Sequence, residues 1–456
     1  MSAVKTRRRP IVAGLLAGVA IGAAVGASTL TGASSESPTG PRPVVLHVAR
    51  VLADPGADLT LTAGLACPGL AVSSTACDVR SAVAHVLPEE AGAWAEIEGR
   101  DEGGGYRFVV SGRSVGDEGL SYWLEFRTES GEVIRLPDGG AATPFRVVTT
   151  GGLREVAWPG EFDLSMPART ADSVVARLVY GDGAREVGRV GGVGDEQPLG
   201  PSSFEVAPDG SLSIADWVHR RVLVMSPRGA PRPTVPLPVA RPVDVAAANH
   251  GELAVTTLGL GATAFELGPD GRVIGRYRVA HGVAERIART PGGPHVWVGP
   301  AQWAPVRSRP GIALPAAAQS RGLASAVPGR DGSVALSQDL SGGRIAFVWA
   351  RPDGSRAGAV LALPAGAQPG VDHFVQGLPD GGAIAARGLW SGSGEAVALL
   401  RFRADGSIAT AYLIAPPTRE MDAAASAVRF RAPDEVLVAY TNRKAFRIER
   451  FEVKAR

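Results

Sequence analysis

Histidine and carboxylate side chains are the groups in this chain that could perform acid–base or metal chemistry. Asp372 precedes His373, so its carboxylate could orient the imidazole as a general base. The chain holds seven His at irregular spacing, and it contains no H-E-x-x-H, G-x-S-x-G or phosphate-binding loop. The residues therefore favour a non-catalytic protein. A lyase or hydrolase with a channel-mouth metal site is the alternative.

Polar residues also fall where the sequence predicts the beginning of inner strands around a channel. We predict that six of them line a ligand-binding face: Glu205, Asp244, Glu285, Asp372, His373 and Asp422. Carboxylates gathered in this way suit Ca²⁺, a hard cation that takes oxygen ligands, although a water-filled channel with solvated walls explains them equally. Trp217 and Trp390 fall near strand ends, where they would either contact a ligand or pack between sheets.

Six short segments that read alike predict the scaffold for these residues. Each follows a turn, such as Asp209-Gly210, and the copies recur every roughly 40 to 50 residues, a period typical of four-stranded propeller blades. The segments are SLSIADW (211–217), ELAVTTL (252–258), HVWVGPA (295–301), SVALSQD (333–339), AIAARGL (383–389) and EVLVAYT (435–441). We therefore expect a six-bladed β-propeller over residues 151–456.

An apolar column runs through these segments and should pack between the blades, because side chains in a strand alternate between its two faces. Its members are Leu212, Leu253, Val296, Val334, Ile384 and Val436. The chain ends near the third strand of the sixth blade, and an open edge invites aggregation. We therefore predict that part of residues 174–190 joins the last blade and fastens the ring.

Residues 43–150 have a different pattern, with seven or eight short alternating strands separated by turn residues. That density of strands predicts a β-sandwich. Trp94 and Trp123 would be core aromatics. The fold class expected for the whole chain is therefore all-β, with a β-sandwich followed by the propeller.

One blade carries a family resemblance. Residues 200–225, GPSSFEVAPDGSLSIADWVHRRVLVM, resemble an NHL repeat, whereas the other five blades keep the turns but lose the Ala-Asp and Arg-Val signature. The resemblance implies a propeller in which Asp216 and Arg221 order the blade through an ion pair and turn hydrogen bonds. Some NHL-type propellers are lyases. In the preceding module, residues 122–137 resemble a hairpin of bacterial immunoglobulin-like or fibronectin-type domains.

The N-terminus predicts export. Arg7, Arg8 and Arg9 precede an uncharged apolar run to about residue 33, which is the pattern of a signal peptide or, if uncleaved, a single N-terminal anchor. Residues 34–42 read as a flexible linker. Cys67 and Cys77 are the only cysteines, and in an exported protein such a pair predicts a disulfide, with a metal pair as the alternative.

Charge excludes one class of partner. Without the four basic residues of the leader, 43 of the 47 basic residues remain against 45 acidic ones, so the chain has no basic surplus for nucleic acid. We expect a secreted or extracytoplasmic monomer that binds a protein or cell-envelope ligand on the propeller's channel face. A structural surface protein is a third possibility.

Overall fold

The computed structural model contains only β-strands and two short 3₁₀ helices in the residues that it describes, which confirms the all-β prediction. Those residues are 44–47, 49–66, 79–103, 105–137, 139–142, 144–164, 168–191, 200–237, 241–247, 253–257, 263–268, 270–278, 286–291, 293–299, 302–305, 327–329, 331–353, 355–417, 427–442 and 444–455. The predicted leader and linker, and Cys67 and Cys77, lie outside them. No helix in the described residues is long and apolar enough to cross a membrane.

Two sheets form the N-terminal unit, which we call the sandwich. Sheet A runs in the order β1 (Val44–His47), β3 (Leu59–Ala66), β7 (Gly105–Val110) and β6 (Arg100–Asp101). Sheet B runs in the order β2 (Leu52–Ala53), β10 (Phe145–Thr149), β8 (Leu120–Thr128), β4 (Val79–Pro88) and β5 (Ala95–Glu98), with β9 (Val133–Leu136) also paired to β8. The 3₁₀ helices are η1 (Gly112–Ser114) and η2 (Gly140–Ala142).

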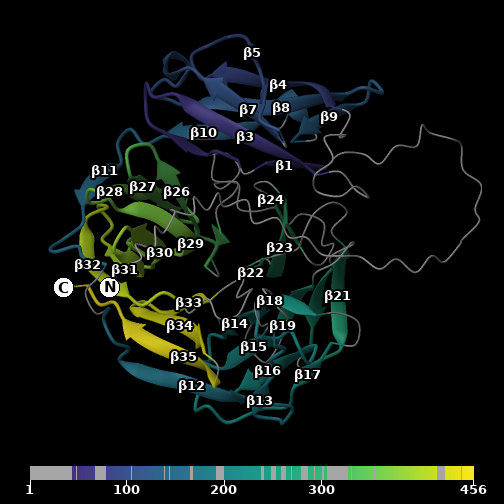
Figure 1. The fold of residues 1–456 in the computed structure, drawn as a ribbon, viewed down its shortest axis with the longest axis vertical. Helices are drawn as coiled ribbons and strands as arrows, with labels where there is room; N and C mark the ends of the chain where they lie inside the picture. Colours follow the sequence, from purple (N-terminus) through teal and green to yellow (C-terminus); the bar gives the residue numbers. More distant parts are fainter. Residues whose placement is uncertain are drawn as a thin grey trace, which may run out of the picture.

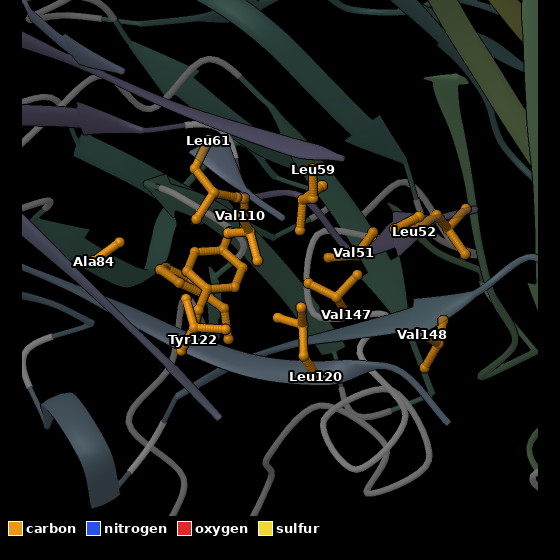
Figure 2. Packing of buried hydrophobic residues seen from close by; sticks show 14 of the residues in the cluster. Val51, Leu52, Leu59, Leu61, Ala84, Val110, Leu120, Tyr122, Val147 and Val148 are labelled. Carbon is orange, nitrogen blue, oxygen red and sulfur yellow. The ribbon is translucent and has the colours of Figure 1, made fainter. Parts of the chain in front are cut away.

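The two sheets pack face to face through their apolar sides. Figure 2 shows Leu59 and Leu61 of sheet A facing Leu120 and Tyr122 of sheet B, and all four are buried. Trp123 was expected in the core, but it is buried on the other face of sheet B, where its ring stacks on that of His85 at 3.7 Å between centroids. Trp94, also expected in the core, is half-buried and meets the Trp123 ring edge to face. The alternation of apolar and polar residues along these strands therefore produces a sandwich core by burying one face of each sheet.

A polar triad crosses this core. His47 Nδ1 donates to the carbonyl oxygen of Thr62 at 2.6 Å, which leaves Nε2 to accept from the Tyr122 hydroxyl at 2.9 Å. The same hydroxyl accepts the backbone N–H of Arg50 at 2.9 Å. Desolvation by burial lowers the pKa of His47 from 6.5 to about 4, opposed by the Thr62 hydrogen bond, and burial raises the pKa of Tyr122. The core therefore holds His47 in its neutral form.

We expect the free energy of unfolding to fall as the pH drops from about 6.5 to about 4. The unfolded chain protonates His47 in this window and the folded chain does not, so the unfolded state binds more protons and gains stability. The gap between the two pKa values corresponds to about 3 kcal/mol. Urea unfolding at about pH 7 and about pH 4.5 measures it. His47→Gln, which preserves a donor and an acceptor, should lose less stability over the window; an identical loss would contradict the prediction.

Six further sheets form a ring (Figure 1). Sheet 1 contains β14 (Ser203–Val206), β15 (Leu212–Asp216), β16 (Arg221–Met225) and β17 (Val235–Pro236). Sheet 2 contains β18 (Pro242–Ala247), β19 (Leu253–Thr257), β20 (Thr263–Leu267) and β21 (Val273–Arg278). Sheet 3 contains β22 (Ile287–Thr290), β23 (Gly293–Gly299) and β24 (Gln302–Pro305) among the described residues.

Two of the remaining three sheets, sheets 4 and 6, include strands from elsewhere in the chain. Sheet 4 contains β25 (Val327–Pro328), β26 (Val334–Leu340), β27 (Arg344–Ala350), β28 (Arg356–Ala362) and β11 (Arg154–Ala157). Sheet 5 contains β29 (Gln368–Gly377), β30 (Ala383–Ser391), β31 (Gly394–Phe402) and β32 (Ile408–Ile414). Sheet 6 contains β33 (Val428–Ala432), β34 (Glu435–Thr441), β35 (Ala445–Glu452), β12 (Ser173–Tyr180) and β13 (Glu186–Val187).

The first strand of each sheet lies at the centre of the ring. Each of these six strands contacts the first strand of the sheet before it and of the sheet after it, and β33 of sheet 6 returns to β14 of sheet 1. The six repeated segments supply the second strands β15, β19, β23, β26, β30 and β34, as the repeat predicted. The chain therefore forms a closed β-propeller.

The ring closes as the sequence predicted. β12, which precedes sheet 1 in the chain, pairs antiparallel with β35, the last strand of the chain. Ala176 and Leu178 of β12 are buried in one cluster with Phe204 and Ile214 of sheet 1. The outer edge of sheet 6 is therefore covered by a segment from the beginning of the propeller, which ties the two ends of the ring together.

The Asp-Gly turns between strands share one geometry. Gly210 and Gly332 have φ values of +81° and +83°, a left-handed conformation that glycine adopts without strain. The preceding Asp accepts the N–H two residues on, as Asp209 does from Ser211 at 2.9 Å. Hydrogen bonds from the side chain and backbone of Ser211 lower the pKa of Asp209. Where it occurs, the Asp-Gly dipeptide thus sets a tight turn between two strands of a blade.

Sheet 4 packs against the sandwich, which the sequence analysis did not foresee. Val334 was expected to pack between blades, but it and Leu336 belong to one buried cluster with Val51 and Leu52 of the sandwich. The opposite face of the sheet, with Phe347, packs toward sheet 5. Figure 1 shows the sandwich lying against the side of the ring at β26 and β27. The sandwich is therefore part of the propeller's packing and not only a spacer.

Candidate functional site

An ion cluster occupies the centre of the ring, where the sequence predicted a binding face. Arg429 of β33 donates through Nη2 to Asp244 Oδ1 at 2.7 Å, and its Nε lies 3.1 Å from Glu205 Oε2. Asp244 also accepts the backbone N–H of Ile287 at 3.1 Å and that of Val245 at 3.0 Å. One arginine of the last sheet therefore joins the inner strands of sheets 1 and 2, and Asp244 extends the link to sheet 3.

This cluster gives two of the predicted binding residues an internal role. The Asp244 side chain is 2% exposed and that of Glu205 15%, and both carboxylates face the Arg429 guanidinium. A buried carboxylate that is paired in this way stabilises the packing of the sheets and offers no open coordination site. The sequence did not single out Arg429, because an arginine in a half-buried strand has no motif of its own.

Two of the other four predicted channel residues lie within the described residues. Glu285 and Asp422 lie outside the described residues. Asp372 and His373 are both in β29, where the Asp372 backbone is opposite Arg387, and the His373 side chain is half-buried. No group of three His, Cys, Asp or Glu within the described ranges lies close enough together to hold a metal ion.

A second polar cluster surrounds Asp216, the motif residue of sheet 1. Its fully buried carboxylate accepts from Arg221 Nε at 2.9 Å and from His219 Nδ1 at 2.7 Å. Its Oδ1 accepts the backbone N–H of Gly188 at 3.1 Å. Arg221 also donates to the carbonyl oxygen of Glu186 at 2.6 Å. The predicted ion pair therefore forms, and it binds sheet 1 to the β12–β13 segment that closes the ring.

His219 in this cluster has the appearance of a catalytic base, but both of its ring nitrogens are occupied. Nδ1 lies 2.7 Å from Asp216, and Nε2 lies 2.8 Å from Asp182, which is almost fully exposed. A general base needs a lone pair directed at the proton of a substrate. With a carboxylate on each side, this imidazole bridges two segments of the chain instead.

The two predicted tryptophans have different surroundings. Trp217 is half-buried, and the guanidinium of Arg241 lies over its ring at 5.5 Å from the centroid. Trp390 is 44% exposed and donates to the carbonyl oxygen of Pro369 at 3.1 Å. Val371, two residues after Pro369 in β29, is 49% exposed. Only Trp390 of this pair therefore presents a large apolar surface to solvent.

A cleft lies between the sandwich and the ring, and we call it the junction cleft. Its volume is about 610 Å³. Arg146 from β10 lines one side, Arg356 from β28 and Arg154 from β11 line the other, and Gly151-Gly152 connects them. Asp117, Glu118 and Asp405 also line the cleft. The walls thus carry charges of both signs, and they bring residues 117–118 and 146–154 together with residues 356–358 and 404–405.

Hydrogen bonds across the boundary hold the two walls of the junction cleft in place. Arg356 donates to the carbonyl oxygen of Thr149 at 3.1 Å, and Arg344 of the ring pairs with Asp54 of the sandwich. Gln338 uses its amide oxygen to accept the backbone N–H of Val51 at 3.0 Å. Its amide nitrogen donates to the carbonyl oxygen of Leu52. The sandwich is therefore fixed to sheet 4 by polar contacts as well as by the shared apolar cluster.

No protein-family model and no curated protein matches the chain. Among similar solved structures, a virginiamycin B lyase from Staphylococcus aureus is 11% identical with a TM-score of 0.32, over 74% of this chain and 92% of the lyase chain. A protein of unknown function from Bacteroides thetaiotaomicron is 9% identical with a TM-score of 0.29, over 92% and 100%. The C-terminal WD40 domain of Sif2 is 11% identical with a TM-score of 0.26, over 72% and 92%. At these TM-scores the matches carry no argument about activity.

Proposed function

We propose that the protein is an exported, non-catalytic binding protein that holds a protein or cell-envelope ligand in the junction cleft. One observation carries this proposal: Arg146 of the sandwich and Arg356 of the ring line the same cleft. A ligand there would contact both units at once. Small-molecule and peptide sites are often found where two units meet, and about 610 Å³ is within the usual range of their volumes.

The charges of the cleft suggest the chemistry of its ligand. Three arginines line it, and guanidinium groups bind carboxylates with two parallel hydrogen bonds. Arg154 pairs with Asp405 and Arg146 lies 3.0 Å from Glu89, but these side chains are 31% to 58% exposed, so a ligand carboxylate would compete only with solvent-screened pairs. The three acidic residues of the cleft would accept from ammonium, amide or hydroxyl groups of the same ligand. A peptide-like fragment with a carboxylate and a polar backbone satisfies both requirements.

The channel face of the ring, which the sequence favoured, is a weaker candidate. Glu205 and Asp244 are already paired with Arg429, so a ligand at that point would have to displace an internal ion pair. The alternative lyase or hydrolase would use Asp372 and His373, which are neighbours in β29.

The predicted fold families, export, disulfide and oligomeric state are part of the same proposal. The NHL-like motif of sheet 1 supports an NHL-type propeller, and the hairpin of β8 and β9 supports an immunoglobulin-like sandwich. Export would come from the N-terminal leader or anchor, and oxidising surroundings would favour a Cys67–Cys77 disulfide. A monomer is consistent with the ring closing on its own chain through β12 and β35.

A thermal-shift screen tests the proposal. Cell-envelope fragments released by mild hydrolysis are fractionated and added to the wild-type protein. A ligand at 100 times its Kd should stabilise the folded state by about 2.7 kcal/mol. We expect an active fraction to stabilise the wild type and the Arg272→Gln control, whose exposed arginine lies on sheet 2, but not the double variant Arg146→Gln/Arg356→Gln. Equal stabilisation of all three proteins, or product formation from the fraction, would contradict it.

A further inference from the structure

A segment of the chain crosses the outside of the ring between sheets 4 and 6. β11 pairs with β28 in sheet 4, and β12 pairs with β35 in sheet 6, so the residues between them pass over the outer strand of sheet 5. We call the described residues 158–164 and 168–172 the strap. The backbone N–H of Arg169 donates to the carbonyl oxygen of Leu413 in β32 at 2.9 Å. The strap is therefore bonded to the rim of the ring.

A second cleft lies between the strap and sheet 5, and we call it the rim cleft. Its volume is about 390 Å³. Trp158 of the strap and Tyr412 of β32 supply aromatic walls, and Glu161, Asp163 and Glu395 supply carboxylates. No described residue that lines it is Arg, Lys or His. The cleft thus combines aromatic rings with negative charge.

The aromatic wall on the strap side is held in place by packing. The rings of Trp158 and Phe162 meet edge to face, with their centroids 5.3 Å apart. Both residues pack against the buried cluster that joins sheets 4 and 5. A ligand that stacks on Trp158 would therefore meet a surface whose conformational entropy has already been lost in folding.

On the other wall of the cleft, the Tyr412 ring contacts a cation of the chain itself. The guanidinium carbon of Arg169 lies over the Tyr412 ring at 4.2 Å from its centroid. The same guanidinium donates to both carboxylate oxygens of Asp172, at 2.9 and 2.8 Å, and to the carbonyl oxygen of Glu452 at 2.8 Å. Arg169 is not among the residues that line the cleft. The chain's own cation thus already uses a ring of this wall as a cation–π partner.

We propose that the rim cleft binds the cationic group of an organic ligand, an alkylammonium or a guanidinium. Aromatic faces attract such cations through the ring quadrupole, and carboxylates nearby add charge-assisted hydrogen bonds. A metal ion is a poorer occupant, because the described residues contain no group of three metal-ligating side chains close enough together. The cation could be a free amine or a Lys or Arg side chain of a peptide, since both have the same chemistry.

This site is separate from the junction cleft. The two clefts share no lining residue, and the rim cleft lies on the far edge of sheet 5 from the sandwich contact of sheet 4. Binding at one can therefore be present when binding at the other fails.

Calorimetric titration of the full chain tests the proposal. The probes are n-butylammonium and arginine amide as free cations, a neutral tripeptide extended by one Arg, and the uncharged comparators n-butanol and glucose. We expect the cations to bind with a Kd of about 1 mM, and the affinity to fall as salt is raised. Comparison of the two arginine probes distinguishes a free cation from a peptide side chain. Tighter binding of the Arg tripeptide than of arginine amide indicates a peptide ligand.

Charge-neutral variants locate the site. Glu161→Gln and Glu395→Gln should each lower the affinity for n-butylammonium by about three- to fivefold without changing Tm, because both side chains are exposed. Glu129→Gln is the matched control, since it removes the same charge from an exposed turn of the sandwich. Trp158→Phe, which keeps an aromatic face, should weaken binding less than Trp158→Leu. Glucose binding in place of cations, no saturable cation binding, or affinities in Glu161→Gln and Glu395→Gln equal to that of Glu129→Gln would overturn the proposal.

Discussion

Replacing Arg429 with Met is expected to lower the free energy of unfolding by about 3–5 kcal/mol. The substitution keeps the apolar volume of the side chain but removes the only guanidinium that the described structure places between Glu205 and Asp244. Two carboxylates at the centre of the ring would then lose the cation that lies between them, and the Asp244 side chain is almost fully buried. Urea unfolding followed by circular dichroism measures the loss.

The matched control for this variant is on the same strand. Arg431 pairs with Glu435 at 2.6 Å, but that pair is partly exposed, so Arg431→Met should cost about 1 kcal/mol or less. Adding Glu205→Gln and Asp244→Asn to Arg429→Met should restore part of the stability, because neutral amides need no counter-charge. A loss in Arg429→Met no larger than in Arg431→Met, or no recovery in the triple variant, would show that the cluster does not hold the inner strands together.

The repeated parts of the propeller could be predicted because they depend on local sequence. An Asp-Gly turn and an alternating strand are specified by residues that are neighbours in the chain, and all six second strands lie where the repeat placed them. The closing strand could also be predicted, because a sheet that ends one strand early must recruit another. Ser173–Tyr180 fills that edge.

The candidate sites could not be predicted, because they join segments that are distant in sequence. Arg146 and Arg356 line one cleft although 210 positions separate them. In the fourth repeat, Gln338 occupies the position that Asp216 has in the first. In the structure it forms hydrogen bonds to the backbone of Val51 and Leu52, so its role depends on where the sandwich packs.

The contacts of sheet 1 explain why the NHL-like motif is intact in that blade. Sheet 1 is the sheet that contacts the closing segment, and Asp216 and Arg221 bind that segment at Gly188 and Glu186. In the sixth repeat, Tyr440 occupies the position of Asp216 and makes a different contact. Its hydroxyl donates to the carbonyl oxygen of Ala415 at 3.0 Å. The motif residues are therefore explained by ring closure and need no ligand.

Asp216→Ala tests that explanation and should cost about 3–5 kcal/mol of unfolding free energy. The change leaves the Arg221 guanidinium without its buried counter-charge and the Gly188 N–H without its acceptor. Because both groups connect sheet 1 to β12 and β13, the ring should open locally at this point. Hydrogen exchange of β12 and β35 amides should then become faster than that of β30 amides in sheet 5.

Asp209→Ala is the matched control, since this aspartate is in the same sheet and its side chain is 44% exposed. It accepts from Ser211 in the turn, and its pairing with Arg232 spans 3.7 Å, so its loss should cost about 1 kcal/mol and leave exchange in β12 unchanged. Asp216→Asn should fall between the two, because it keeps an acceptor for Gly188 but not the charge that faces Arg221. If Asp216→Ala destabilises the protein while β12 and β30 exchange speeds up equally, the cluster stabilises the blade itself and the ring is closed by the β12–β35 pairing alone.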